Sequence, residues 1–369
     1  MNTKAYAPGE HPDLPAPKST SGPIAWMRDN LFSSPTNIVL TIISAWFLYK
    51  ILPPAFEWFI FDAAYTGESR QDCRAKADGA CWAFVGERFA LFTYGFYPIE
   101  ERWRVNLCFI LLPLAMVPVL WDKAPFRKQG LWFAIAFPFI AGWLLLGGFG
   151  LAEVPTDKFG GFMLTLVIGI TGIAFSLPIG ILLALGRMSK LPIIRVFSVC
   201  FIEFIRGVPL ITLLFVASTM LSYFLPPGTT FDLLLRVLIM VTLFASAYMA
   251  EVIRGGLQAI PKGQTEAADA MGLKYWQSMR LVVLPQALKI SIPGIVNTFI
   301  GLYKDTTLVI IIGLLDPLGI GRASVATTEW GGLSTEIYVF VGIFFFISCF
   351  AMSRYSLYLE KKLETSHKR

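Results

Sequence analysis

The chain has 369 residues, of which 55% are hydrophobic and only 15% are charged. A soluble globular protein carries about 25% charged residues, so this deficit excludes an ordinary soluble domain. The repeated apolar runs are long enough to cross a bilayer as helices, and they predict an all-α integral membrane protein. The net charge of +6 is explained by lysines and arginines in cytoplasmic loops, so we expect no nucleic acid partner.

Polar segments begin and end the chain. Residues 1–36 are rich in Pro and Ser and lack the apolar stretch of a cleavable signal peptide, so they predict a disordered cytoplasmic tail. Residues 361–369 predict a second cytoplasmic tail. Between the tails we expect about eight spanning helices, since a span needs roughly 20 apolar residues. Their approximate ranges are 37–56, 105–121, 131–149, 162–185, 198–224, 231–250, 290–315 and 337–357.

The distribution of basic residues predicts the orientation of these helices. With the amino terminus inside, most of the 31 Lys and Arg residues fall on the cytoplasmic side, together with both termini. The long loop 57–104 is then periplasmic. We expect a boundary near 151–158 between an N-terminal three-helix extension, residues 37–150, and a five-helix core, residues 151–360.

Residue types that metal and nucleotide chemistry require are missing from the apolar part of the chain. The only histidines, His11 and His367, lie in the terminal tails, which argues against a metal site or His-based catalysis. No GxxxxGK[ST] phosphate-binding loop is present. We therefore expect a protein that is not itself an enzyme and holds no cofactor.

Two of the five cysteines, Cys73 and Cys81, share the long polar loop. Disulfides persist outside the cytoplasmic membrane of a bacterium, so we favour a structural bridge between them over two unpaired thiols. The other three, Cys108, Cys200 and Cys349, lie in apolar runs and are typical packing residues.

The hydrophilic segment 251–289 interrupts the apolar part of the chain. Within it, Glu266–Ala268 is followed by three residues and Gly272, then by nine residues and Val282–Pro285. A Pro-Lys-Gly-Gln break ends the preceding helix, and residues 264–271 favour a helix that Gly272 stops. The sequence therefore predicts a separate crosswise helix of about two turns, roughly 12 Å long.

This spacing resembles the EAA loop of the membrane subunits of bacterial ABC importers. Other stretches resemble the polar amino acid branch of that family: GGFMLTL at 160–166, FIRGVPL at 204–210, AYMAEVIRGG at 247–256 and NTFIGLYKDTTL at 297–308. In the last of these, Thr307 stands where the family has Ser. The extension, with GACW at 79–82 and YGFYP at 94–98, is similar to the M-type permease subunits of general L-amino acid importers.

The resemblance implies a permease that docks on a separate ATPase. The residues of this ATPase-coupling loop would be Gly263, Gln264, Glu266, Ala267, Ala268, Gly272, Leu284 and Pro285. The implied partners are a pair of ATPase subunits that hold ATP and Mg, a second permease subunit in a heterodimer, and a periplasmic binding protein that delivers an amino acid. The implied location is the bacterial inner membrane, with the lipid bilayer around a multi-pass chain.

Charged residues inside spans are costly and often functional. Lys304 and Asp305 interrupt an apolar helix after Asn297. We interpret these three, with Arg206 and Glu251, as candidates for the translocation path or its gate. The alternative is that they form pairs that fix helix packing.

Three pairs have helical spacing and favour structural roles. They are Glu203–Arg206 and Glu251–Arg254 at i,i+3 and Asp232–Arg236 at i,i+4. The second of these pairs would anchor the coupling loop.

The sequence gives less support to two other classes of function. A secondary transporter driven by an ion gradient would show inverted repeats and interrupted helices in matching halves, and neither is visible in the sequence. A membrane-embedded transferase would need a cluster of acidic or His residues near a membrane face, and both histidines lie in tails. The sequence favours the permease subunit of an ATP-driven amino acid importer.

Overall fold

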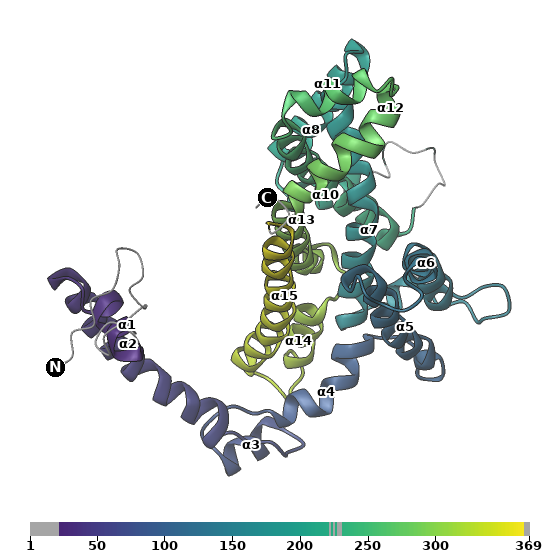
Figure 1. Ribbon diagram of the computed structural model, residues 1–369. Coiled ribbons are helices and arrows are strands. Elements are labelled where there is room, and N and C mark those ends of the chain that lie inside the picture. Colours follow the sequence, from purple (N-terminus) through teal and green to yellow (C-terminus); the bar gives the residue numbers. More distant parts are fainter. Residues whose placement is uncertain (1–21, 221–222, 224–225, 227–230, 365–369) are drawn as a thin grey trace, which may run out of the picture. The chain divides into compact units, whose positions relative to one another are not determined.

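The structure, a computed structural model, describes residues 22–220, 223, 226 and 231–364, and within them no β-sheet forms (Figure 1). His11 and His367 lie outside the described residues. The helices are α1 Pro23–Leu31, α2 Pro35–Phe56, α3 Arg70–Lys76, α4 Ala83–Tyr94, α5 Arg102–Leu120, α6 Arg127–Leu146, α7 Gly161–Arg187, α8 Pro192–Gly207, α9 Leu210–Phe215, α10 Leu233–Gln258, α11 Lys262–Ala270, α12 Tyr275–Ser278, α13 Leu284–Asp305, α14 Pro317–Val325 and α15 Ser334–Glu364.

Seven helical segments in the described part of the chain are long and apolar enough to cross a membrane, and a bent pair of helices makes an eighth. The predicted all-α membrane fold with about eight spans is therefore confirmed. The fifth predicted span, 198–224, differs from the structure because it is not one helix. It starts earlier, at Pro192, and bends by 101° between α8 and α9. Pro209 sits in this break, where proline disfavours a helical residue before it.

The seventh predicted span, 290–315, also differs in its bounds. A continuous helical segment runs from Tyr275 to Ile312. It includes a π-helical turn at Met279–Val283 before α13 and a 3₁₀ turn at Thr306–Ile312 after it. The last part of segment 251–289 is thus helix rather than loop.

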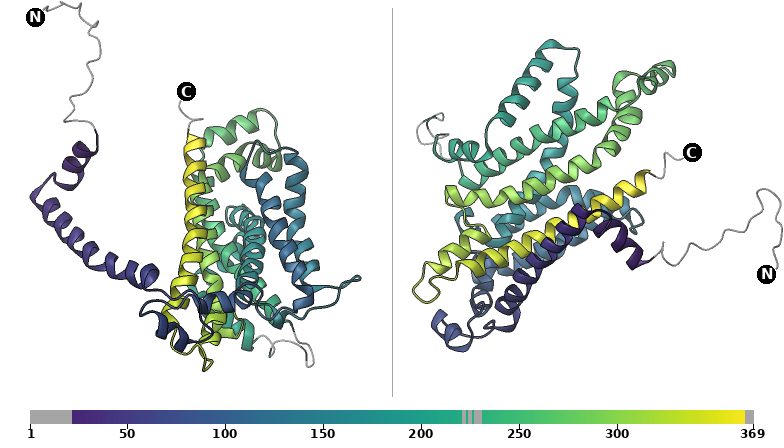
Figure 2. Two further views of the ribbon diagram at one scale, coloured as in Figure 1. Left: turned by 90° about the horizontal axis from the view of Figure 1, so that it is seen from below. Right: turned by 90° about the vertical axis from the view of Figure 1, so that its left-hand side faces the viewer.

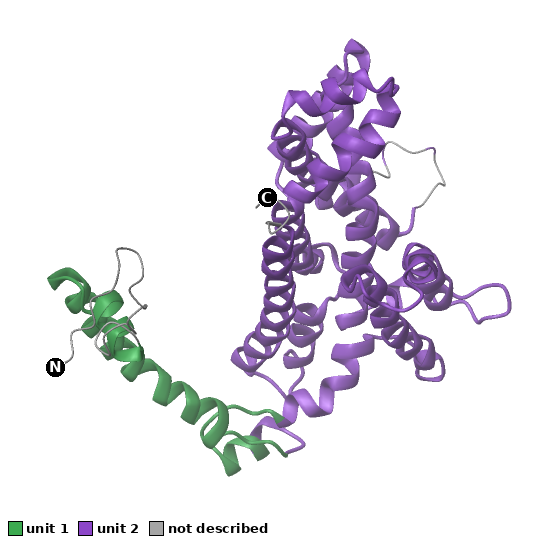
Figure 3. Cartoon of the chain, in the orientation of Figure 1, with its two compact units in different colours: residues 1–66, 72–82 green, residues 67–71, 83–369 purple. Residues whose placement is uncertain are grey.

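The chain divides into two compact units (Figure 3). Unit 1 contains the described residues up to Thr66 and Asp72–Trp82, and unit 2 contains Gly67–Gln71 and the chain from Ala83 onward. This division differs from the predicted one at residue 150, because α5 and α6 pack in the same unit as the core. Residues 23–31, placed by the sequence in a disordered tail, form helix α1.

Unit 1 consists of α1, α2 and a disulfide-linked segment. Helix α2 begins where the Ser34 side chain accepts a hydrogen bond from the N–H of Asn37 (3.2 Å), a typical N-cap. None of the residues of α2 is buried. A disulfide joins Cys73 to Cys81, whose Cα atoms are 5.6 Å apart. The loop predicted at 57–104 therefore has structure of its own, including α3 and α4.

Unit 2 is built around the contact of α7, α10 and α13, with α15 running along α13 and α14 (Figures 1 and 2). Small residues allow these helices to approach closely. A Cβ atom added at Gly172 of α7 would lie 2.9 Å from the Leu302 side chain of α13, and one at Gly180 would lie 2.7 Å from the Met249 side chain of α10. Close backbone approach therefore holds the bundle together.

Helix α14 starts at a buried carboxylate. Asp316 is fully buried, and its Oδ1 accepts a hydrogen bond from the N–H of Gly319 (2.9 Å). Within the described part of the chain, its Oδ2 has no hydrogen-bond partner. Burial raises the pKa of Asp316 to about 6, and the bond from the Gly319 N–H opposes this shift.

We expect Asp316→Asn to stabilise the protein at neutral pH. An unfolded Asp has a pKa of about 3.9, so between about pH 4 and 6 the folded state binds a proton that the unfolded state lacks. Stability therefore rises as pH falls through this window and is lost as pH rises, by about 2–3 kcal/mol for a shift of this size. Asn keeps the N-cap without the charge. The melting temperature in detergent should rise for the variant at pH 8 and approach the wild-type value at pH 4.

A matched control is available at α10. Asp232 caps that helix in the same way, accepting from the N–H of Leu235 (2.9 Å), but its side chain is exposed. Asp232→Asn should give no comparable rise of the melting temperature at pH 8, because its side chain is already exposed to solvent. A wild-type melting temperature that stays flat between pH 4 and 8 would contradict a buried ionised Asp316.

Candidate functional site

Segment 251–289 contains one separate short helix. Helix α10 continues to Gln258, and α11 runs from Lys262 to Ala270. The predicted separate helix is therefore confirmed, although it begins slightly earlier than the sequence suggested. Both α11 and α12 lie at one end of unit 2 (Figure 1).

A Schellman motif ends α11. The N–H of Gly272 donates to the carbonyl of Asp269 (2.9 Å), and the N–H of Leu273 donates to that of Ala268 (3.1 Å). This pair of bonds requires a left-handed residue between them, and Gly272 has φ 74°. Glycine adopts this conformation without a steric cost. The backbone of Gly272 thus fixes the direction in which the chain leaves α11.

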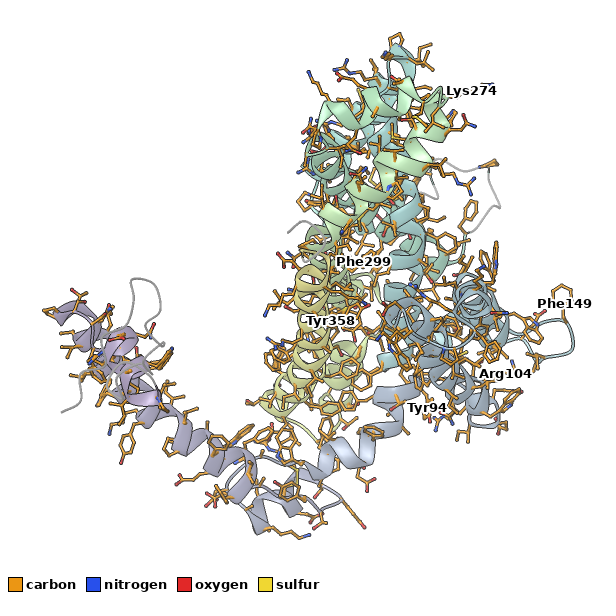
Figure 4. All side chains as sticks on the ribbon, in the orientation of Figure 1. Tyr94, Arg104, Phe149, Lys274, Phe299 and Tyr358 are labelled. Carbon is orange, nitrogen blue, oxygen red and sulfur yellow. A yellow bond between two sulfur atoms is a disulfide. The ribbon has the colours of Figure 1, made fainter. Side chains whose placement is uncertain are left out.

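Most of α11 is exposed. Among its residues only Ala268 is buried, and Met271, which follows it, is 81% exposed. Tyr275 and Trp276 of α12 are also exposed. We call residues 262–278, which include α11 and α12, the α11–α12 surface; its Lys274 is labelled in Figure 4, at the other end of unit 2 from Tyr94. Met271, Tyr275 and Trp276 thus give this surface exposed apolar side chains that are close together in the sequence.

The motif residues divide between α11 and α13. Those exposed on α11 are Gly263, Gln264, Glu266 and Ala267, whereas Leu284 and Pro285 begin α13. A hydrogen bond from Nε2 of Gln286 to Oε1 of Gln264 (3.0 Å) joins the two helices. Helix α12 and the π-helical turn connect them along the chain as well. The α11–α12 surface is therefore attached to a membrane-spanning helix by two routes.

Five charged residues of α7, α8 and α10 form what we call the Glu251 cluster: Arg187, Glu203, Arg206, Glu251 and Arg254. The carboxylate of Glu251 is central. It lies 2.8 Å from Nη1 of Arg187, 2.9 Å from Nη2 of Arg254 and 3.8 Å from Nη1 of Arg206. Arg206 also lies over the ring of Tyr248, 5.4 Å from its centroid. The cluster joins three helices beside the start of segment 251–289.

Two of the three predicted charge pairs are wrong. Glu203 pairs with Arg187 (2.7 Å) rather than with Arg206, because the end of α7 packs closely against α8. Asp232 caps α10, and Arg236 instead donates to the carbonyl of Ser218 (2.8 Å). These backbone partners replace the predicted surface pair.

The third predicted pair, Glu251–Arg254, is present at 2.9 Å. Arg254 also donates from Nη1 to Oε1 of Gln258 (2.7 Å), near the end of α10. The pair therefore lies directly before the turn into α11.

The remaining path candidates lie on α13. Asn297 and Lys304 are exposed and about two turns apart, so they share a face of the helix. Gly301 lies between them, and a Cβ atom added there would meet nothing within 4 Å. Asp305 is half-buried at the end of α13. The structure thus brings Arg206 and Glu251 together and places Asn297, Lys304 and Asp305 elsewhere, along one membrane-spanning helix.

Sequence reasoning missed Arg187 as a member of the cluster. Arg187 and Glu203 are 16 residues apart in the sequence, which is farther than the spacing at which residues of one helix meet. Its position at the end of an apolar helix is ordinary for a basic residue. The sequence carried no signal that would have found this contact.

Comparisons with known proteins agree with these features. A model of the family described as binding-protein-dependent transport system inner membrane component matches residues 176–365. The inner membrane amino-acid ABC transporter permease protein YhdY of Escherichia coli (strain K12) is 51% identical over 358 residues, covering 96% of this chain and 97% of that protein. The glutamate/glutamine/aspartate/asparagine transport system permease protein BztC of Rhodobacter capsulatus is 46% identical, covering 96% of each.

A solved structure, described as an amino acid ABC transporter with histidines, is 28% identical. It covers 54% of this chain and 91% of its own, with a TM-score of 0.48. The family model includes α11 and the Glu251 cluster, and the two permeases align along nearly the whole chain. The chain belongs to the family of binding-protein-dependent transport system inner membrane components.

Proposed function

We propose that this chain is the permease subunit of an ATP-driven amino acid importer. The observation that carries the proposal is the alignment, over 96% of the chain, with two permeases named for amino acid transport. The α11–α12 surface adds a physical basis, because it is an exposed helix with apolar side chains beside it. Such a helix fits a groove on a partner protein.

The partner at the α11–α12 surface would be an ATPase subunit. The Gln264–Gln286 hydrogen bond and the helical path through α12 both lead to α13. When ATP and Mg close a pair of ATPase subunits, a displacement of α11 would therefore act on α13. This is coupling between two sites through a defined element.

The remaining partners follow from the same proposal. A periplasmic binding protein would deliver the amino acid, and a second permease subunit, in a heterodimer, would complete the pathway. Both termini and α11 would face the cytoplasm of a bacterial cell. The chain would span the inner membrane with its apolar helices in the lipid bilayer.

We place the translocation path beside α13. A polar stripe formed by Asn297 and Lys304 on a membrane-spanning helix is costly against lipid, and it would instead face the pathway or the second subunit. Asp305 would lie at its end. Arg206 and Glu251 would act as positioning residues, because their partners are each other and neighbouring arginines.

We expect Gly272→Val to abolish amino acid uptake while the protein still inserts into the membrane. A Cβ atom at Gly272 would meet nothing within 4 Å, so the effect comes from the left-handed backbone alone. That conformation costs a residue with a side chain about 1–2 kcal/mol, and most for a β-branched one. The end of α11 should unwind. Uptake of labelled amino acids by cells, with membrane levels measured by immunoblot, tests this.

Gly272→Asn is the matched control, since Asn tolerates the left-handed region. It should retain most of the uptake and still co-purify with an ATPase subunit. Normal uptake by Gly272→Val would argue against α11 as the coupling helix. Purification of the wild-type chain without any ATPase partner would argue against the proposed function itself.

A further inference from the structure

A deep cleft separates the α5–α6 pair from α7 and α10. Its volume is about 1020 Å³, and residues of all four helices line it. We call it the hairpin cleft. The part of the cleft that lies between the helices, which we call its shaft, is apolar. Its lining includes Phe109, Leu112, Val167, Ile170 and Leu238. It lies apart from the α11–α12 surface and from the Glu251 cluster, so the proposed function leaves it unused.

The length of the hairpin cleft matches one leaflet of a membrane. On α7 its lining runs from Met163 to Phe175, which at 1.5 Å per residue is about 18 Å. One leaflet of a hydrocarbon core of about 30 Å measures about 15 Å. The lining residues of α10 lie in the first two turns of that helix, and those of α5 and α7 end just past the midpoints of theirs. The aromatic contact between Phe139 and Phe175, with centroids 5.9 Å apart, lies at its inner end.

The mouth of the hairpin cleft is polar and held firmly. Arg104 donates from Nη1 to the carbonyl of Ala152 (2.7 Å), and the hydroxyl of Tyr97 donates to the carbonyl of Leu145 (2.8 Å). These bonds connect the start of α5 and the segment before it to the end of α6 and the segment after that helix. The opening is therefore a fixed feature of unit 2.

Acidic side chains surround the mouth. Glu153, Asp157 and Asp232 line it together with Thr156, and no Lys or Arg is among the described residues that line the cleft. Glu153 and Asp157 are exposed. An ammonium group suits this rim, whereas a headgroup of net negative charge is disfavoured.

We propose that the hairpin cleft binds one phospholipid with an ammonium headgroup, such as phosphatidylethanolamine. The acyl chains fill the apolar shaft over one leaflet, and the ammonium group lies among Glu153, Asp157 and Asp232. A membrane-spanning helix of another subunit does not fit this site, because such a helix crosses both leaflets and the cleft covers one. A free amino acid does not fit either, because the shaft offers almost no partners for its charged groups.

Native mass spectrometry of the full-length chain, with its co-purifying subunits, tests the proposal. The sample is released from nanodiscs that contain equal amounts of phosphatidylethanolamine and phosphatidylglycerol. We expect one tightly retained lipid, with phosphatidylethanolamine preferred. Val167→Trp fills the shaft and should remove this lipid. Leu182→Trp, at a 66% exposed position of the same helix outside the cleft, should retain it.

The headgroup preference has its own variant. Glu153→Gln combined with Asp157→Asn should keep the bound lipid but lower the preference for phosphatidylethanolamine by about two- to fivefold, since exposed charge pairs are weak. Equal retention of both lipids by the wild-type protein would overturn the headgroup assignment. Equal lipid retention by Val167→Trp and Leu182→Trp would show only unspecific lipid around the protein and would overturn the site.

A second measurement tests the same site without Val167→Trp, so that a folding defect of this variant does not affect the result. A photoreactive phenylalanine analogue replaces Phe109 in the cleft or, as a control, the exposed Phe204 of α8. Adducts at Phe109 should be enriched in phosphatidylethanolamine over phosphatidylglycerol, and adducts at Phe204 should not. Adducts of Phe109 with another protein chain would show that a partner subunit fills the cleft and would overturn the proposal.

Discussion

Glu251→Ala is expected to destabilise the protein by about 2–4 kcal/mol, because removing one member of a mostly buried ion pair leaves its partners uncompensated. The Glu251 side chain is 15% exposed, and three arginines surround its carboxylate. Without it, Arg187, Arg206 and Arg254 repel one another where α7, α8 and α10 meet. The melting temperature in detergent should fall strongly, and α8 should become accessible to protease.

Glu203→Ala is the control for this prediction. Glu203 is 55% exposed, and among the described residues its carboxylate forms an ion pair with Arg187, so its loss should change stability by less than about 1 kcal/mol. Glu251→Gln, which keeps an acceptor without the charge, should fall between the two alanine variants. Equal melting temperatures for Glu251→Ala and Glu203→Ala would mean that the cluster contributes no more than an ordinary surface pair.

Gly256→Ala is expected to have the second large effect, a loss of about 1–3 kcal/mol from overpacking. A Cβ atom at Gly256 would lie 2.5 Å from the backbone carbonyl oxygen of Ala287 and even closer to the hydroxyl of Ser291. The carbonyl belongs to α13 and cannot rotate away as a flexible side chain would. The whole start of α13 must therefore move away from α10. Because the α11–α12 surface is attached there, amino acid uptake should fall as well.

The neighbouring glycine supplies a matched pair. A Cβ atom at Gly255 would meet nothing within 4 Å, so Gly255→Ala should be neutral or stabilise helix α10 by about 0.5–1 kcal/mol. Thermal unfolding and uptake of the two variants should be measured side by side. If both substitutions had the same effect, the close contact between α10 and α13 at Gly256 would have no energetic role.

Local signals in the sequence predicted those parts of the molecule that depend on neighbouring residues. The apolar runs predicted the spans. Gly272 predicted where α11 ends, because the left-handed position after a helix is usually occupied by glycine. The pair Glu251–Arg254 followed from helical spacing. Each of these features is contained within a few turns of one helix.

Features that depend on contacts between helices could not be predicted in this way. Arg187 reaches Glu251 only because α7 and α10 pack side by side. No local pattern in the sequence indicates that these two helices are neighbours. Arg236 donates to backbone carbonyls of Ala217 and Ser218, in the π-helical turn after α9, and not to Asp232 at the N-cap of its own helix. The break at Pro209 was visible as a residue, but long apolar runs on both sides favoured one continuous span.

The break between α8 and α9 has a consequence for solvation. Irregular backbone at membrane depth leaves N–H and C=O groups without helical partners, and hydrocarbon cannot supply them. The stretch from Gly207 to Leu210 therefore cannot face acyl chains. In a bilayer, water or polar protein atoms would have to cover this break. The bend between α8 and α9 therefore predicts a hydrated or protein-covered surface at this place.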